Sequence, residues 1–356
     1  MSEPQTRANK RQSATIRDVA ELAGVSTMTV SRVLNNRELV REETRTRVED
    51  AIRTLKYRPN ILARGLAGGR SLHIGLIYEN PSHGYLSEFV LGALNQCREQ
   101  RHHLVLEELT TDGEELRSDQ VVERILAAGV DAVVIPPPAS ANQEIINALQ
   151  QLELPFARVI HGPRSGEGFE VFIDDVAAAR EMTEYLIKAG HRRIGFIKGA
   201  PYHFAADQRL EGFLATMAAH GLNVPYTSVA QGHFTYRSGM DAAAALMKAR
   251  PRPTAIFASN DDMAAGAISM LLREGLRVPD DISVVGFDDT ELATAVWPQL
   301  TTVRQPIARM AATAVELLSQ HAAANAPYAD AHEERLLDVQ IIKRGTVGTP
   351  REAKTA

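Results

Sequence analysis

The sequence predicts an α/β protein in which a small all-α helix-turn-helix domain precedes a two-lobed core built on parallel sheets. Two observations support this prediction. Residues 15–55 read as three short helices, and the first two are joined by a very tight turn. From residue 72 onward, short apolar runs alternate with helical stretches, a pattern typical of parallel sheets that helices cover on both faces. A chain of 356 residues can form both parts.

Composition narrows the class of protein. The chain is 44% hydrophobic and 5% aromatic, as in ordinary globular proteins. It has no run of 18 apolar residues, and its first fifteen residues lack the apolar segment of a signal peptide, so we expect a cytoplasmic, nucleoid-associated protein with no membrane contact. The single cysteine, Cys97, excludes an internal disulfide and a cysteine-based zinc cluster. We expect no metal and no cofactor.

Charge is distributed unevenly along the chain. Residues 1–70 contain 14 Lys and Arg against 8 Asp and Glu, whereas the remaining residues contain 25 against 36. A basic head on an acidic body suggests that the head alone meets a polyanion, although a solvated charged surface is an equal alternative.

The first two helices have clear start and stop signals. Thr15 with Asp18 resembles a capping box, and the apolar spacing of a helix then continues to Gly24. Ser26 can cap the second helix, and Ala20 is small enough to lie where the two helices cross. This turn is too short for an ordinary loop and favours a helix-turn-helix.

The second helix has one apolar face and one polar face. Its inward residues are Val30, Val33 and Leu34, and its outward residues are Thr27, Met28, Ser31, Arg32 and Asn35. Such a face suits the major groove, where an arginine can bond guanine and an apolar group can contact a thymine methyl. A third helix over residues 41–55 offers Arg45, Arg47 and Arg53, which are either phosphate contacts or a solvated face.

The segments "ATIRDVAELAGVSTMTVSRVLNN" and "TRTRVEDAIRTLKYRPNILARGLAGGRS" resemble the DNA-binding head and hinge of the lactose repressor/galactose repressor family of bacterial transcription regulators. The resemblance implies that the second helix reads double-stranded operator DNA. It assigns DNA contacts in the head to Ile16, Arg17, Ser26, Thr27, Met28, Ser31, Arg32 and Asn35. In the hinge it assigns them to Asn60, Ala63, Arg64 and Leu66, with Leu66 as a minor-groove wedge.

Beyond the hinge, polar residues follow the predicted strands. One series of strands runs from "HIGLIY" to "FARVI", and a second starts with "EVFID" and continues through "RIGFIKG", "AIFAS" and "SVVGFD". Ligands of open α/β sheets bind beyond the carboxyl ends of the strands. The carboxylates, amides, arginine and aromatic rings found there suit a polyol, although Asn260 and Asp261 could instead serve only as helix caps.

The body, over residues 72–345, resembles the effector core of the same family, itself similar to periplasmic sugar-binding proteins; the matching motifs include "RLEGF", "AIFASNDDMAAGA" and "PQLTTVRQP". By position the resemblance assigns effector binding to Tyr85, Leu86, His203, Arg209, Phe234, Asn260 and Asp288. The chain departs from the family pattern in three places. "NPSHGYLSEF" replaces "NPFF", "RVIHG" replaces the usual aspartate after the fourth strand, and three prolines stand at the pocket edge. The identity of the effector therefore does not transfer.

The resemblance also predicts how the chain is divided. It implies a flexible N-terminus (1–14), a helix-turn-helix domain (15–58), a hinge (59–70), a first lobe (72–172 and 301–326), a second lobe (173–300 and 327–345) and a flexible tail (346–356). It further implies a homodimer that reads a pseudo-palindromic operator. Trp297 lies either at the dimer contact or in a lobe core, and the tail has no heptads for a coiled coil.

The predicted function is a repressor of carbohydrate uptake or catabolism genes that a sugar-type effector releases from its operator. One alternative is a regulator activated by a purine-type corepressor, which reverses the sign of the response. A sugar-acting enzyme or a transporter's binding protein is a further alternative. Both leave the helix-turn-helix unexplained, and the sequence contains no G-x-S-x-G, H-E-x-x-H or phosphate-loop motif.

Overall fold

The computed structural model describes residues 16–35, 40–55, 71–111, 114–115, 118–160, 166, 168–201, 203–324, 328 and 331–350. The chain divides into two compact units, residues 1–70 and residues 71–356. The predicted flexible N-terminus and the hinge lie outside the described residues.

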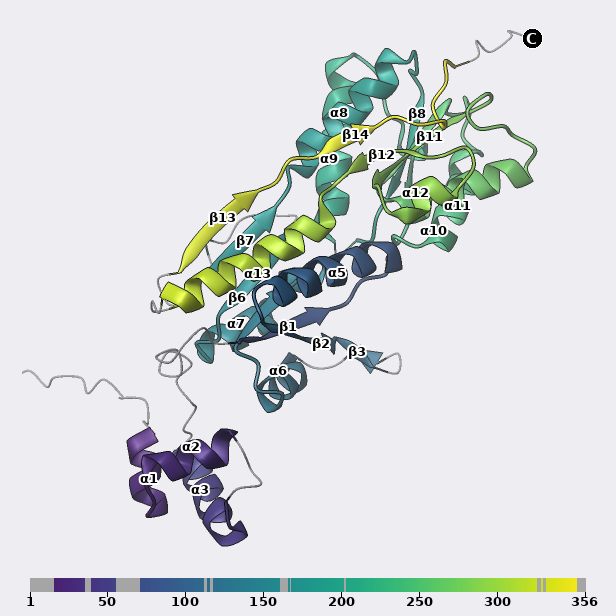
Figure 1. The fold of residues 1–356 in the computed structure, drawn as a ribbon. Helices are drawn as coiled ribbons and strands as arrows, with labels where there is room; N and C mark the ends of the chain where they lie inside the picture. The colour runs from purple at the N-terminus through teal and green to yellow at the C-terminus, as the bar shows by residue number, and fades with distance from the viewer. Residues whose placement is uncertain are drawn as a thin grey trace, which may run out of the picture. The chain divides into compact units, whose positions relative to one another are not determined.

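The first unit contains the predicted helix-turn-helix (Figure 1). Its helices are α1 (Ile16–Ala23), α2 (Thr27–Asn35) and α3 (Glu42–Leu55). Gly24 takes a φ of 63° in the turn, and the Ser26 hydroxyl accepts a hydrogen bond from the amide of Thr29 at 3.1 Å. A core of small apolar side chains holds the helices together: Val19, Ala20, Ala23, Val30, Val33, Val48 and Ala51.

The second unit contains two sheets, each of six strands among the described residues. The first sheet has the order β13-β7-β6-β5-β1-β2 and is parallel throughout. Its strands are β1 (His73–Tyr78), β2 (His103–Glu108), β5 (Ala132–Ile135), β6 (Phe156–Ile160), β7 (Gly168–Phe172) and β13 (His332–Leu336). A short hairpin of β3 (Thr110–Thr111) and β4 (Glu114–Glu115) follows β2.

The second sheet has the order β14-β12-β11-β10-β8-β9, and only β14 runs antiparallel to its neighbour among these strands. Its strands are β8 (Ile194–Lys198), β9 (Val229–Gln231), β10 (Ala255–Ala258), β11 (Ser283–Asp288), β12 (Thr301–Arg304) and β14 (Gln340–Ile342).

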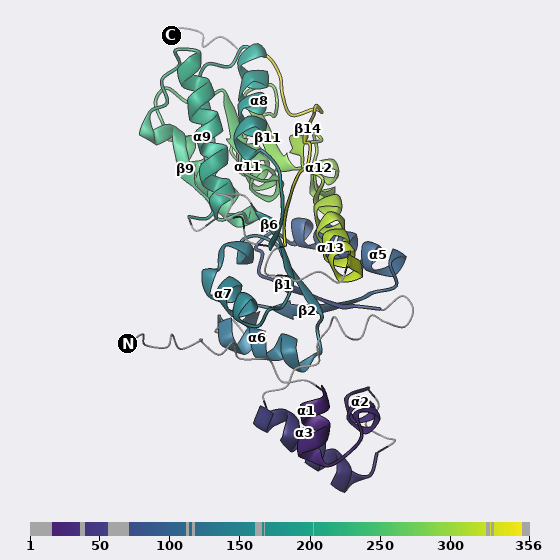
Figure 2. The ribbon, with the colours of Figure 1, turned by 90° about the vertical axis from the view of Figure 1, so that its left-hand side faces the viewer.

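Helices cover both faces of each sheet, as the alternation of strands and helices predicts (Figures 1 and 2). The first sheet packs between a pair formed by α5 (His83–Glu99) and α13 (Ile307–Ala324) and a pair formed by α6 (Ser118–Ala127) and α7 (Gln143–Gln151). The second lies between α8 (Asp175–Lys188) with α9 (Phe204–Ala219) and α10 (Tyr236–Leu246) with α11 (Asp261–Arg273), and α12 (Glu291–Ala295) packs against α11. Two short 3-10 turns, Ala139–Ala141 and Tyr226–Ser228, connect strands and helices of this unit.

Two crossovers between the lobes differ from the predicted boundaries, and a third agrees with them. β7 pairs with β6 in the first sheet, as the predicted end of the first lobe at residue 172 requires, although the strand pattern alone counts the "EVFID" run with the second series. β12 was expected in the first lobe but pairs with β11 in the second, and β13 was expected in the second lobe but pairs with β7 in the first. A short apolar strand can form its backbone hydrogen bonds in either sheet, so the pattern of apolar residues does not show which lobe the strand joins.

The end of the chain is also more ordered than predicted. Thr346 is fully buried, and its hydroxyl accepts a hydrogen bond from the Thr301 amide at 2.9 Å. The Gly348 amide donates to the Ser283 hydroxyl at 3.0 Å. Residues 346–350 therefore pack on the second lobe, and only residues 351–356 of the predicted tail lie outside the described residues.

Candidate functional site

A cavity lies between the two lobes, at the carboxyl ends of strands from both sheets. It contains about 310 Å³ of atom-free space, part of which is open to solvent. Its lining residues are Asn80, Ser82, Tyr85, Pro137, His203, Arg209, Phe234, Asn260, Asp288 and Gln305. This is the position at which open α/β sheets bind ligands, and the lining combines an aromatic ring with several convergent polar groups.

Six of the seven predicted effector residues line this cavity: Tyr85, His203, Arg209, Phe234, Asn260 and Asp288. Leu86 does not line it and is half-buried on α5. Neighbouring residues of a helix point about 100° apart, so the adjacent Tyr85 enters the cavity while Leu86 turns away from it.

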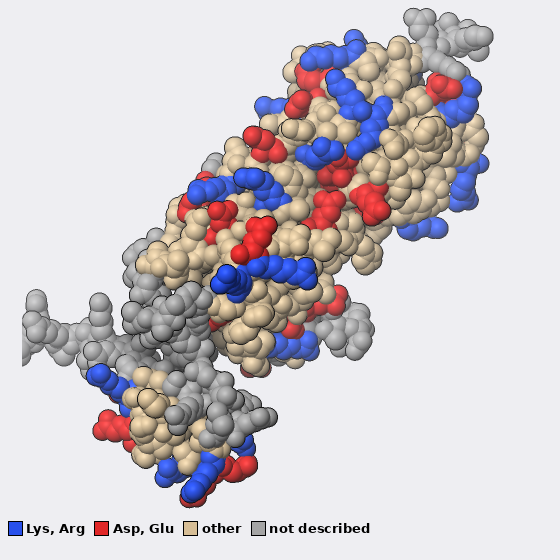
Figure 3. All heavy atoms as spheres, in the orientation of Figure 1, with Lys and Arg blue, Asp and Glu red and all other residues tan. Residues whose placement is uncertain are grey.

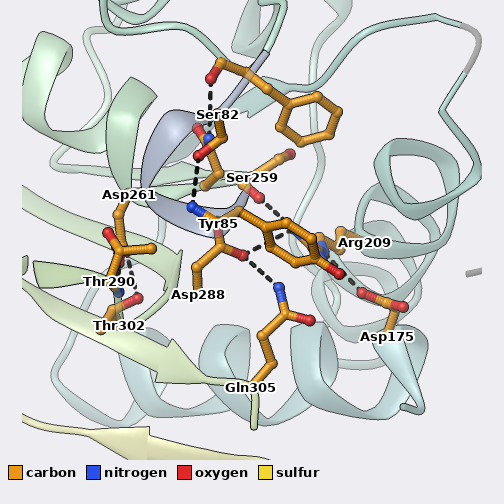
Figure 4. A network of polar contacts seen from close by, with 12 residues as sticks. Ser82, Tyr85, Asp175, Arg209, Ser259, Asp261, Asp288, Thr290, Thr302 and Gln305 are labelled. Atoms are coloured by element: carbon orange, nitrogen blue, oxygen red, sulfur yellow. Dashed lines mark hydrogen bonds and ion pairs between the residues drawn. The ribbon is translucent and has the colours of Figure 1, made fainter. Parts of the chain in front are cut away.

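Arg209 is held rigidly at the centre of the site (Figure 4). Its Nε donates to Asp175 Oδ1 at 2.8 Å, and its Nη1 donates to the Ser259 carbonyl at 2.5 Å. The same Nη1 lies 3.8 Å from Asp288 Oδ1, and the guanidinium lies 3.5 Å from the centre of the Phe287 ring. Because two buried carboxylates face one guanidinium, the centre of the site carries no surplus positive charge.

Asp288 ends β11 with an unusual backbone, at φ 118°. Its Oδ1 accepts a hydrogen bond from Gln305 Nε2 at 2.5 Å. Burial raises the pKa of Asp288 to about 7, although the Arg209 charge and the Gln305 hydrogen bond act in the opposite direction. A carboxyl group that titrates near neutral pH therefore faces the cavity.

Asn260 is a helix cap as well as a cavity residue. Its Oδ1 accepts from the Met263 amide at 3.0 Å, which caps α11, and its Nδ2 donates to the Phe234 carbonyl at 3.0 Å. Asn260 therefore caps α11 but does not serve only as a cap, because it also lines the cavity and its Nδ2 holds the loop that carries Phe234. Asp261 instead faces the interior of the second lobe, where it accepts from Thr302 Oγ1 at 2.6 Å.

Phe234 and His203 form the aromatic side of the cavity. Their rings meet edge to face with centres 4.8 Å apart. Phe234 takes a φ of 60°, and its ring fills the space beside Gly199 that any side chain at that position would occupy. These features place the Phe234 ring on the wall of the cavity.

The sequence assigned no effector role to Asn80, Ser82, Pro137 and Gln305, which also line the cavity. Ser82 connects the lobes, because its Oγ donates to Asp262 Oδ2 at 2.6 Å. Asn80 follows the "HIGLIY" run, Pro137 is one of the three prolines at the pocket edge, and Gln305 lies within the "PQLTTVRQP" motif. No local signal indicated that the Gln305 side chain reaches Asp288.

A larger hollow lies between β9 and α10. Its lining is mainly apolar and includes Tyr226, Ala242, Ala245 and Leu246. The cavity between the lobes therefore remains the candidate ligand site.

The structure describes the side chains of some of the predicted DNA-contact residues of the head. Thr27 and Met28 are exposed on α2, with Met28 at 65%, and Arg17 is exposed on α1. Ile16 is half-buried against the head core, and the Ser26 hydroxyl caps α2. The side chains of Ser31, Arg32 and Asn35, and the hinge positions Asn60, Ala63, Arg64 and Leu66, lie outside the described residues. The inward positions Val30 and Val33 are buried as predicted.

The rest of the described surface offers few competing sites. On the face of the core drawn in Figure 3, acidic and basic side chains are interspersed. Among the described residues, no group of three or more His, Cys, Asp or Glu side chains could hold a metal ion. No helix in the same residues is long and apolar enough to cross a membrane.

Comparison with known proteins gives matches over both units. The model of bacterial regulatory proteins of the lacI family matches residues 15–60, and that of a periplasmic binding protein-like domain matches residues 183–347. The ribose operon repressor of Escherichia coli K12 is 36% identical over 307 residues, covering 86% of this chain and 92% of the relative. The transcriptional repressor PurR of Vibrio cholerae is 32% identical over 337 residues, covering 94% and 98%.

A solved structure agrees with these relatives. The lac repressor dimer bound to operator and the anti-inducer ONPF has a TM-score of 0.68 and 29% identity, covering 95% of this chain and all of that one. The helix-turn-helix head, the two parallel-sheet lobes and these matches lead to one conclusion: the chain belongs to the lacI family of DNA-binding transcriptional repressors.

Proposed function

We propose that the chain represses carbohydrate uptake or catabolism genes and is released from its operator by an uncharged sugar-type effector bound between the lobes. The observation that carries this proposal is the pairing of Arg209 with both Asp175 and Asp288. A guanidinium already matched by two carboxylates does not favour an anionic ligand such as a sugar phosphate, whereas Asp288 and the nearby amides can bond hydroxyls. The Phe234 ring can cover the apolar face of a sugar.

Effector and operator binding would be linked through closure of the lobes. The Ser82–Asp262 hydrogen bond joins the lobes beside the cavity, and Gln305 stands on the crossover between β12 and α13. An effector that favours the closed core would change the orientation of the first lobes of the dimer and so lower the affinity for the operator. Linkage requires that operator DNA weakens effector binding by the same factor.

We further propose that the repressor works as a homodimer without catalytic activity. Trp297 is 84% exposed, so it packs in neither lobe core of its own chain and is available for a contact between subunits. A dimer would present two heads to the half-sites of a pseudo-palindromic operator. Arg209 donates a hydrogen bond to the buried carboxylate of Asp175, and Gln305 donates one to that of Asp288. Carboxylates held in this way suit ligand binding.

The test combines two measurements on the full chain. A thermal-shift screen against neutral aldopentoses, aldohexoses, disaccharides, sugar phosphates and purines should show stabilisation by a neutral sugar, because a ligand of the folded core raises Tm by mass action. Operator DNA is then selected from random sequence, and the stabilising sugar should weaken its binding. Stabilisation only by a phosphorylated sugar would contradict the neutral-effector proposal. Tighter operator binding with the ligand would indicate a corepressor, and turnover of the sugar would contradict the regulator-only proposal.

Effector affinity should depend on pH with a defined sign. Because the pKa of Asp288 is raised to about 7, its carboxylate takes up a proton as the pH falls through neutrality. Effector hydroxyls that donate to the carboxylate then compete with this proton, so affinity should fall by up to about tenfold per pH unit below about pH 7 and be nearly constant above it. Titration calorimetry with the stabilising sugar between about pH 5.5 and 8.5 measures this profile. Affinity that is flat or rises toward low pH would exclude Asp288 as the acceptor.

A further inference from the structure

Two buried polar atoms in the cavity are left without a hydrogen-bond partner. They are the Tyr85 hydroxyl, on α5 of the first lobe, and Gln305 Oε1, on the crossover that follows β12. Tyr85 is 5% exposed and Gln305 is 3% exposed, and both residues line the same cavity. Buried polar groups are nearly always hydrogen-bonded in folded proteins, so two open ones facing a ligand site indicate what the ligand supplies.

The atom of Gln305 that has no partner is Oε1, a carbonyl oxygen that can accept a hydrogen bond but cannot donate one. The Nε2 of Gln305 donates to Asp288 Oδ1, which fixes the orientation of the amide and turns Oε1 away from the carboxylate (Figure 4). Burial raises the pKa of the Tyr85 phenol well above its usual value, so the hydroxyl keeps its proton and can donate. Tyr85 therefore offers an open donor, and Gln305 offers an open acceptor.

Packing alone does not require the Tyr85 hydroxyl. The Tyr85 ring stacks on Phe89 with centres 6.1 Å apart, and a phenylalanine ring would make the same contact. The hydroxyl adds a buried donor that the chain itself does not satisfy, which is costly unless a ligand uses it.

We propose that Tyr85 and Gln305 form a donor–acceptor pair that selects an effector with a hydroxyl group at one defined position. An alcohol accepts from Tyr85 while donating to Gln305, whereas an ether or carbonyl oxygen satisfies only Tyr85 and an ammonium group satisfies only Gln305. The effector hydroxyl would link α5 of the first lobe to the crossover between β12 and α13, so it would also stabilise the closed core. This inference rests on the proposed sugar effector and names the two side chains that read one of its hydroxyls.

The experiment is a double-mutant cycle in the full chain between Tyr85→Phe and deoxy sugars. The probes are D-ribose, D-xylose, D-arabinose, D-glucose and D-galactose; the one that stabilises the protein most is compared with its monodeoxy derivatives by titration calorimetry. Tyr85→Phe should weaken binding of the parent sugar about tenfold. One deoxy derivative should bind the wild-type chain about tenfold more weakly and bind Tyr85→Phe with little further loss.

The controls separate this inference from the proposed function. Tyr226→Phe removes the hydroxyl of a tyrosine that is 94% exposed and should leave all affinities unchanged. Thermal unfolding without sugar checks that Tyr85→Phe folds normally. If the parent sugar binds but every deoxy derivative loses the same factor on both proteins, the donor–acceptor pair is wrong while the sugar effector stands. If none of the five sugars stabilises the wild-type chain, both proposals for this cavity fail for monosaccharides.

Discussion

Asp288→Asn is expected to weaken effector binding by roughly 10- to 150-fold while leaving operator binding unchanged. The substitution removes a carboxylate whose hydrogen bonds to ligand hydroxyls contribute about 1.5–3 kcal/mol. Asparagine keeps the shape, tolerates the positive φ of 118° at this position, and can still accept from Gln305 Nε2. The fold should therefore survive, and the variant should stay bound to its operator at sugar concentrations that release the wild-type chain.

The measurement is calorimetry with the stabilising sugar, followed by operator titration with and without that sugar. Asp280→Asn is the matched control, because it makes the same chemical change at an exposed surface position. An unaltered response to sugar in Asp288→Asn would remove Asp288 from the effector site. Loss of operator binding in the absence of sugar would instead indicate damage to the fold.

Val30→Ala should remove operator binding while sparing the effector site. Val30 is fully buried in a head core of small side chains, and loss of two methyl groups there costs about 1.5–3 kcal/mol. A domain of this size has little stability to lose, so much of the population would have an unfolded head near 37 °C. The core forms a separate compact unit and should keep its sugar affinity.

Circular dichroism during thermal unfolding would show an early transition of the head in Val30→Ala, and a second transition of the core at the wild-type Tm. Thr46→Ala, on the exposed side of α3, is the control for a substitution that leaves the core intact. A single transition that shifts as a whole would contradict the independence of the two units. Normal operator affinity in Val30→Ala at about 37 °C would contradict the prediction, because it would show that the head stays folded without the two methyl groups.

The local features of the head could be predicted because each has a signal within a few residues. Val30 and Val33 are buried, while Thr27 and Met28 are exposed, as helical spacing predicts. Gly24 and Ser26 mark the turn and the cap for reasons of backbone geometry alone. The assignment of DNA contacts to this helix came from the family resemblance and stays a prediction for each residue.

Much of the candidate site could also be predicted, because parallel strands end at a common edge. Arg209, Phe234, Asn260 and Asp288 converge from different elements, as the strand-end rule and the resemblance together suggest. Leu86 shows the limit of assignment by position, since adjacent helical residues face different directions. Gln305 shows another limit, because its role depends on a side-chain hydrogen bond to Asp288 at the end of the neighbouring strand.

The sequence by itself determined the fold class, the two kinds of domain and the chemical types gathered at the cavity, since periodicity, caps and strand ends are local properties. Only the tertiary structure decided that β13 joins the first sheet, that β12 joins the second and that residues 346–350 pack on the second lobe. It also decided which polar atoms around Arg209 are already paired and which, at Tyr85 and Gln305, remain open. The physical reason is that strand pairing and hydrogen-bond satisfaction depend on partners far away in the chain, and no short stretch of sequence contains both partners.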